Sequence, residues 1–115
     1  MMERLKVFYF PDAIDGPVRE QLDSLKGCRP GAWAKLVVDI ETLSVEGPRT
    51  KRANVRPLGS GLWELKRRFD GIQYRLFFCV HERAIWLLHM IEKKSAKTPR
   101  DDLRLADRRY RTLLS

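Results

Sequence analysis

The stretch LWELKRRFDGIQYRLFFCV (residues 62–80), followed after three residues by AIWLLHMI (residues 84–91), decides the fold of this chain. It holds three apolar runs separated by the turn sequences Asp70-Gly71 and His81-Glu82-Arg83. Short apolar runs with turn residues between them are typical of antiparallel strands in a meander. We therefore expect three consecutive strands over Leu62–Arg68, Gln73–Val80 and Ala84–Ile91.

The hairpin loops predict which residues face one another. With a four-residue first loop and a three-residue second loop, Lys66 falls opposite Arg75, and Arg75 opposite His89. Side chains alternate between the faces of a sheet, so one face is predicted to be the apolar core. That core face would carry Trp63, Leu65, Leu76, Phe78, Trp86 and Leu88. The other face would carry the row Lys66, Arg75 and His89, with Glu64, Phe77 and Leu87 in the next row.

This cationic row is the candidate functional site. Like charges opposite one another destabilise a sheet by roughly 0.2–1 kcal/mol per pair, and an anionic ligand would relieve that repulsion. Beyond the last strand, Lys93, Lys94 and Lys97 continue the positive field, and Glu64 is close enough to orient a lysine. The plain alternative is a solvated charged face, because a one-residue slip in register would scatter the row. Taken alone, His89 is better explained as a core histidine, because a single His beside apolar residues more often has that role.

The flanking segments predict helices on either side of a long loop. Lys6 to Phe10 is typical of a strand, Pro17 to Gly27 and Trp33 to Leu43 have helical apolar spacing, and 46–61 (EGPRTKRANVRPLGSG) has neither period. Thr98 can cap a last helix that has Pro99 at its first position. The apolar stripe of that helix is Leu103, Ala106, Tyr110 and Leu113. We expect one α+β domain over residues 1–115, in the order β-α-α-β-β-β-α, with a largely antiparallel sheet packed by helices on one face.

The charge distribution favours an anionic partner. The formal net charge is +8, with 6 Lys+Arg against 8 Asp+Glu in residues 1–48 and 17 against 7 in residues 49–115, which total the 23 and 15 of the chain. Such a surface suits nucleic acid, an acidic protein or a membrane surface. No apolar run approaches the ~20 residues of a membrane span, and residues 1–10 lack the apolar core of a signal peptide. We expect a cytoplasmic protein.

Three weaker candidates have plainer explanations. Cys79, His81 and His89 lack the spacing of metal ligands, so we expect no metal site and no cofactor. The tryptophans Trp33, Trp63 and Trp86 could stack on bases but fall on apolar faces, which favours the core. The basic last helix is either a solvated face or a backbone-binding surface. Its arginines are Arg100, Arg104, Arg108, Arg109 and Arg111.

The element order and several motifs resemble the RelE/ParE superfamily of bacterial toxins, and the motifs look like its HigB-like branch. The motifs are Pro57-Leu58, Leu62-Trp63-Glu64-Leu65, Tyr74-Arg75, Leu88-His89, Lys93-Lys94 and Lys97-Thr98-Pro99. The resemblance implies the toxin of a type II toxin-antitoxin system. Such a toxin would be a metal-independent endoribonuclease that cuts messenger RNA at the ribosome and so inhibits translation and growth.

The resemblance also implies roles for individual residues. The catalytic set would be Lys66, Arg75, His89 and Lys94, and the RNA-binding set Glu64, Lys93, Lys97, Arg68 and Arg100. Arg75 would hold the phosphate oxygens, Lys66 would share proton transfer, and His89 is the alternative acid or base. The HigB-like pattern usually has Arg where this chain has Lys66, which keeps the charge and loses the bidentate grip. RelE-like enzymes can use a tyrosine of the last helix, and the candidate here is Tyr110.

Partners and rival functions follow from the same resemblance. The partners would be messenger RNA, the ribosome and a cognate antitoxin of the helix-turn-helix type, with no membrane. A ParE-like inhibitor of DNA gyrase shares the fold. The presence of Lys66, Arg75, His89 and the Lys93-Lys94 pair favours the nuclease over it. A non-catalytic nucleic-acid-binding module, or a protein whose basic face receives an acidic partner, would use the same charges.

Overall fold

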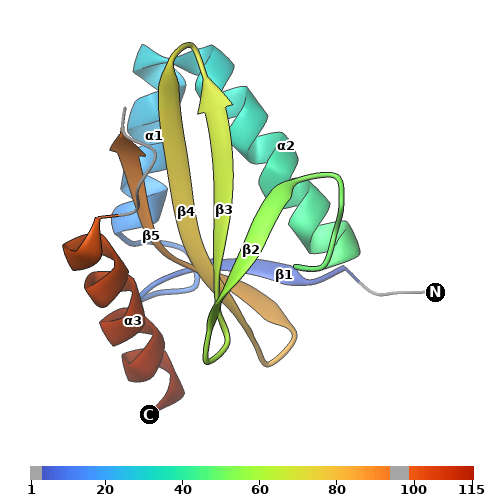
Figure 1. The fold of residues 1–115 in the computed structure, drawn as a ribbon, viewed down its shortest axis with the longest axis vertical. Coiled ribbons are helices and arrows are strands. Elements are labelled where there is room, and N and C mark those ends of the chain that lie inside the picture. Colours follow the sequence, from blue (N-terminus) through green and yellow to red (C-terminus); the bar gives the residue numbers. More distant parts are fainter. Residues whose placement is uncertain (1–3, 94–98) are drawn as a thin grey trace.

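A computed structural model describes residues 4–93 and 99–115 of the chain and shows an α+β fold (Figure 1). The expected order of elements is confirmed, with one strand added before the meander. The elements are β1 (Lys6–Tyr9), α1 (Pro17–Cys28), α2 (Pro30–Glu46), β2 (Asn54–Gly59), β3 (Leu62–Phe69), β4 (Ile72–His81), β5 (Ala84–Lys93) and α3 (Arg100–Leu114). Within the described residues, no helix is long and apolar enough to cross a membrane.

The strands form one mixed sheet in the order β1-β5-β4-β3-β2. Strands β2 to β5 are antiparallel to their neighbours, as the meander predicts, while β1 pairs in parallel with β5. The turns of the last two hairpins are Asp70-Gly71 and Glu82-Arg83, and all four of these residues have positive φ. Two-residue turns with positive φ match the twist of a hairpin.

The prediction of an irregular loop over 46–61 is wrong, because β2 occupies its second half. Proline and glycine weaken a strand pattern, yet β2 lies at the edge of the sheet, where a missing N–H donor is tolerated. Its pairing with β3 shifts register between Pro57 and Gly59. Val55 and Leu58 are partly buried against the two cores, which gives this basic segment enough apolar contact to form a strand.

The helix pair α1 and α2 covers one face of the sheet, and Figure 1 shows both helices behind the sheet, with α1 packed on β5 and α2 on β3. The main core lies between this helix pair and the sheet. Its buried members from the helices are Val18, Leu22, Leu25, Ala32, Leu36, Ile40 and Leu43, and those from the sheet are Leu65, Tyr74, Leu76, Phe78, Ile85, Leu87 and Met90. Four of the six residues expected on the core face, Trp63, Leu65, Leu76 and Phe78, are confirmed there.

Helix α3 packs on the opposite face, so the expectation of helices on one face only is wrong. A second core forms there around the predicted stripe of the helix, and it includes Tyr110. The buried members of this core are Leu62, Phe77, Cys79, Leu88, Ile91 and Ala106. Nη1 of Arg109 donates a 2.7 Å hydrogen bond to the carbonyl oxygen of Leu88 and ties the helix to β5. We call this side the α3 face of the sheet.

The predicted register between β4 and β5 is wrong. The hairpin closes with two residues, so His81 faces Ala84, and a bulge between Phe77 and Phe78 shifts the rest of the ladder. His89 consequently faces Phe77, and Ile91 takes the place opposite Arg75.

The slip also exchanges faces in β5. Trp86 and Leu88, expected in the main core, pack in the second core on the α3 face. Leu87, expected on the cationic face, is buried in the main core.

The beginning of α3 differs slightly from the prediction. Pro99 precedes the helix as its N-cap residue and is not its first residue. The cap expected from Thr98 falls outside the described residues. Asp101 and Asp102 occupy the first turn, where carboxylates stabilise the positive end of the helix dipole.

Candidate nucleic-acid interface

The pairing of Lys66 with Arg75 on neighbouring strands is confirmed. Both side chains lie on the α3 face. Lys66 is at even spacing along β3 from Leu62, which belongs to the second core, and Arg75 faces Lys66 on the neighbouring strand. The next row on the same face consists of Arg68, Gln73 and Lys93. Two rows therefore place four cationic residues across β3, β4 and β5.

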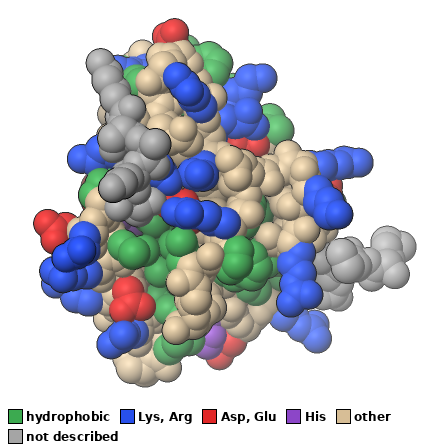
Figure 2. Space-filling model, viewed as in Figure 1, with side chains coloured by type: hydrophobic (Ala, Val, Ile, Leu, Met, Phe, Trp, Pro, Cys, Tyr) green, Lys and Arg blue, Asp and Glu red, His purple; other side chains and the backbone are tan. Residues whose placement is uncertain are grey.

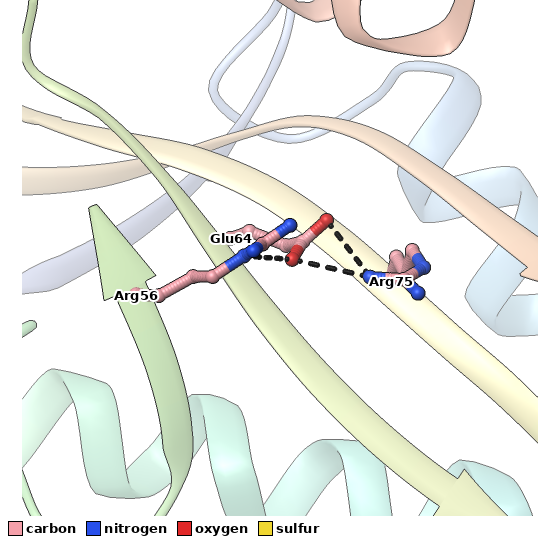
Figure 3. Close-up of polar contacts among 3 residues, drawn as sticks. All are labelled: Arg56, Glu64 and Arg75. Atoms are coloured by element: carbon pink, nitrogen blue, oxygen red, sulfur yellow. Dashed lines mark hydrogen bonds and ion pairs between the residues drawn. The ribbon is translucent and has the colours of Figure 1, made fainter. Parts of the chain in front are cut away.

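Arg75 is buried, with 1% of its surface exposed, so the prediction that it forms part of an exposed row is wrong. Its Nη1 donates to both carboxylate oxygens of Glu64, each at 3.3 Å. Glu64 is itself fully buried and also accepts a 2.8 Å hydrogen bond from Nε of Arg56. Figure 3 shows these three side chains meeting across β2, β3 and β4. Glu64 thus holds two arginines, where a lysine was expected as its partner.

Arg56 is the member of this network that the sequence reasoning missed. It belongs to β2, and a segment assigned to a loop offers no register from which to place a side chain. Its side chain is half exposed, in contrast to the buried side chains of Glu64 and Arg75. No alternation marks the segment, because its partly buried residues Val55 and Leu58 are three positions apart. The available signal is its position directly before a predicted strand.

The accessible cations surround this buried network. Lys66 is half-buried, while Arg68 and Lys93 are exposed. Arg100 is also exposed, at the first position of α3. Figure 2 has the same view as Figure 1 and shows Lys and Arg side chains around a central apolar area. The candidates Lys94 and Lys97 lie outside the described residues.

His89 is not part of the Lys66–Arg75 row and has a carboxylate partner of its own. Its Nε2 lies 2.7 Å from Oδ1 of Asp102, and its ring stacks on Phe77 with centroids 5.9 Å apart. The His89 side chain is 12% exposed. The contact joins β5 to the first turn of α3, so it anchors the helix. The same contact would also orient the imidazole for proton transfer.

Other predicted side chains take structural positions. Trp33, Trp63 and Trp86 all pack against the two cores, as expected. Cys79 is buried, and burial raises the pKa of its thiol to about 12. In the part of the chain that the structure describes, no three His, Cys, Asp or Glu side chains gather in the way a metal ion requires.

Tyr110 lies against the turn between β2 and β3. A Cβ at Gly61, which has a φ of +94°, would come within 2.2 Å of the Tyr110 hydroxyl oxygen. Position 61 therefore favours glycine, because of its positive φ and because any side chain there would displace the Tyr110 ring. Tyr110 therefore packs where its apolar stripe predicts.

Fold and site together define a small α+β domain, consistent with a RelE-like fold, with a basic sheet face. A scan against protein-family models matches residues 23–111 to the family described as Phage derived protein Gp49-like (DUF891). The chain belongs to this family, which is RelE-like and associated with the toxins of toxin-antitoxin systems. Comparisons with the curated proteins and with the solved structures each gave no significant match.

Proposed function

We propose that the chain is the toxin of a type II toxin-antitoxin system and a metal-independent endoribonuclease of the HigB-like kind. It would act in the cytoplasm on messenger RNA bound to the ribosome. The observation that carries this function is the pairing of Lys66 with Arg75 on a sheet face that α1 and α2 leave open. Membership of a toxin-associated family supports the same conclusion.

The reaction would be attack of a ribose 2′-hydroxyl on the adjacent phosphorus. The bond from phosphorus to the 5′-oxygen breaks, leaving a 2′,3′-cyclic phosphate and a 5′-hydroxyl. One proton leaves the 2′-oxygen and one reaches the 5′-oxygen, so the step needs a proton acceptor and a donor. We assign this proton transfer to Lys66, the accessible member of the pair, with Lys94 and His89 as the further candidates.

The cations around Lys66 would stabilise the negative charge that builds on the phosphate. Arg68 and Lys93 are exposed and can contact the RNA backbone directly. Arg75 is buried beside Glu64, so we assign it a positioning and electrostatic role. A fixed charge at a site with little water acts more strongly than the same charge in water.

One observation favours a second function. Two of the predicted catalytic side chains, Arg75 and His89, are held by the carboxylates of Glu64 and Asp102. A module that only binds nucleic acid has the same accessible cations and needs neither side chain for chemistry. The second candidate is therefore a non-catalytic binding protein.

The toxin function includes a cognate antitoxin, which we expect to be of the helix-turn-helix type. The α3 face is basic, and an inhibitor with an acidic segment would be complementary to it. Such a partner would compete with RNA for Lys66, Arg68 and Lys93. Loss of inhibition when these residues are replaced would support the shared surface, and unchanged inhibition would place the antitoxin elsewhere.

The test is tightly controlled expression of the chain, with growth and messenger RNA 5′ ends recorded together. The variants are Lys66→Ala and the control Lys35→Ala, which changes an exposed residue of α2 on the other side of the sheet. We expect growth arrest and codon-phased cuts from the parent and the control, and neither from Lys66→Ala. Arrest without cuts would overturn the nuclease in favour of a gyrase inhibitor. Neither arrest nor cuts in the parent would favour the binding module.

A further inference from the structure

A basic groove of about 470 Å³ lies at the edge of the sheet where β2 begins. Five of the seven residues that line it are Lys or Arg, and none is acidic: the cations are Lys51, Arg52, Lys66, Arg67 and Arg68. By contrast, the groove between α1 and α2 mixes two cations with the carboxylates of Asp23 and Glu41. The groove at the sheet edge therefore carries charge of a single sign.

The groove exists because β3 is longer than β2 at this end. The last pair of the two strands is Asn54 with Lys66, and β3 continues to Phe69. Arg67 and Arg68 thus lie beyond the start of β2. The segment with Lys51 and Arg52, which leads from α2 into β2, forms the other wall.

Arg67, one of the residues that line the groove, forms an ion pair with Asp39 of α2. Nε of Arg67 donates to Oδ2 of Asp39 at 2.7 Å, and Nη2 donates to Oδ1 at 2.5 Å. Asp39 is 2% exposed, so its carboxylate is not accessible to a ligand in the groove and balances the charge of Arg67. That hydrogen bond raises the pKa of Arg67. Arg67 is therefore a structural member of the groove, and its charge is already balanced.

The remaining cations are available to a ligand. Lys51 and Arg68 are exposed. Arg52 has an ion pair with Glu46 at 3.4 Å, but its side chain is 80% exposed, and such surface pairs are weak. Lys66 lines the groove and also faces Arg75 across the sheet. One side chain thus belongs to both the groove and the candidate site.

We propose that this groove binds the sugar-phosphate backbone of the single-stranded RNA that contacts Lys66. This inference rests on the proposed function only for the identity of that strand as the substrate. Exposed Lys and Arg side chains bind phosphates without contacting the bases. The groove would therefore increase the affinity for RNA and help to position the strand, but it would give no sequence preference. Lys51 and Arg52 would be the residues that contact phosphates away from the cleaved bond.

The experiment measures binding of a fully 2′-O-methylated single-stranded RNA by fluorescence anisotropy over a range of salt concentrations. This probe has no free 2′-hydroxyl, so the result does not depend on cleavage. The test variant is Lys51→Gln with Arg52→Gln. The control is Lys6→Gln with Lys35→Gln, which removes the same charge from exposed residues at β1, the opposite edge of the sheet, and on α2.

Two lost phosphate contacts should make the slope of log K against log salt shallower by about 1.4, because each contact with a single strand contributes about 0.7. From a common affinity at 1 M salt, this change in slope corresponds to a fall in affinity of about 25-fold at about 0.1 M salt. The control should keep the slope of the parent. A test variant with the slope and affinity of the control would overturn the groove, provided both fold with the parent's circular dichroism spectrum.

Cleavage of unmodified RNA, measured separately, distinguishes this inference from the proposed function. A parent that does not cleave, together with a shallower slope in the test variant, would leave the groove in place and reject the nuclease. A parent that cleaves, together with an unchanged slope, would reject the groove and keep the nuclease.

Discussion

The buried carboxylate of Glu64 accepts hydrogen bonds from Nη1 of Arg75 through both of its oxygens, each at 3.3 Å. The two residues lie on neighbouring strands, and neither side chain has more than 1% of its surface exposed. Arg56 reaches the same carboxylate from the edge strand. The centre of the α3 face therefore holds the buried ion pair of Glu64 and Arg75, and the half-exposed Arg56 contacts its edge. The accessible cations lie around this network.

Replacing Glu64 should destabilise the fold, because the Arg75 guanidinium would lose the carboxylate that balances it in the interior. For Glu64→Gln we expect the free energy of unfolding to fall by about 3 kcal/mol. Denaturant unfolding would measure the change. Glu82→Gln is the matched control, since this side chain is 84% exposed, and it should leave stability unchanged. Equal stability of both variants would show that the buried pair contributes nothing.

The Asp39–Arg67 pair should couple α2 to β3. A double-mutant cycle with Asp39→Asn and Arg67→Gln should give an interaction free energy of about 2 kcal/mol, because the carboxylate is buried and the bond is bidentate. The same cycle on Arg19 and Asp23, an exposed pair within α1, should give about 0.3–0.5 kcal/mol. Similar values for the two cycles would contradict the anchoring role of Asp39.

The His89–Asp102 contact should hold the first turn of α3 on the sheet. Asp102→Asn should lower the free energy of unfolding by about 1 kcal/mol and speed amide exchange at the start of α3. The neighbouring Asp101→Asn is a close control, because the Asp101 side chain is 96% exposed.

The same two variants separate anchoring from catalysis at His89. If the contact is only an anchor, cleavage by folded Asp102→Asn should match that of Asp101→Asn. A loss of cleavage in Asp102→Asn, with the helix still protected from exchange, would instead assign His89 to proton transfer.

The two cysteines should differ sharply in reactivity. Cys28 is exposed, while burial raises the pKa of the Cys79 thiol from 9.0 to about 12. A thiol reagent at mildly alkaline pH should therefore label one cysteine per native chain and two per unfolded chain. Rapid labelling of Cys79 in the native chain would contradict its burial under α3.

The Cys79 shift also predicts a pH dependence of stability. Between the unfolded pKa of 9.0 and the folded pKa of about 12, the folded chain keeps the thiol proton that the unfolded chain has lost. The contribution of Cys79 to stability should therefore decline as pH rises through this window. Cys79→Ala should show a smaller decline than the parent when unfolding is measured across the same pH range.

The fold could be predicted from the sequence where apolar period and turn residues agree. The pairing of Lys66 with Arg75 follows from the Asp70-Gly71 turn, and the stripe that ends at Leu113 locates the packing side of α3. The segment before the meander could not be predicted in this way. Its strand is stabilised by the neighbouring strand β3 and by the two cores, and contacts of that kind leave no local period.

The site was predicted less completely, for two physical reasons. The β4–β5 turn is one residue shorter than predicted, and a bulge at Phe77 and Phe78 adds one residue to β5. Nothing local in the apolar runs marks either change, so the predicted position of His89 was two residues, or one row, away from its actual position. Burial was the second difficulty. The predicted strand pairing places Lys66 opposite Arg75, but it does not predict that Arg75 is buried in an ion pair with Glu64.

The most direct test of the central claim is single-turnover cleavage of a defined messenger RNA in a cell-free translation system. The parent is compared with Lys66→Ala and Lys35→Ala, all shown to be folded. We predict products ending in a 2′,3′-cyclic phosphate from the parent and from Lys35→Ala, and a rate at least a hundredfold lower from Lys66→Ala, on the order of the loss of one acid–base group. Equal cleavage by Lys66→Ala and the parent would contradict a nuclease site on the α3 face.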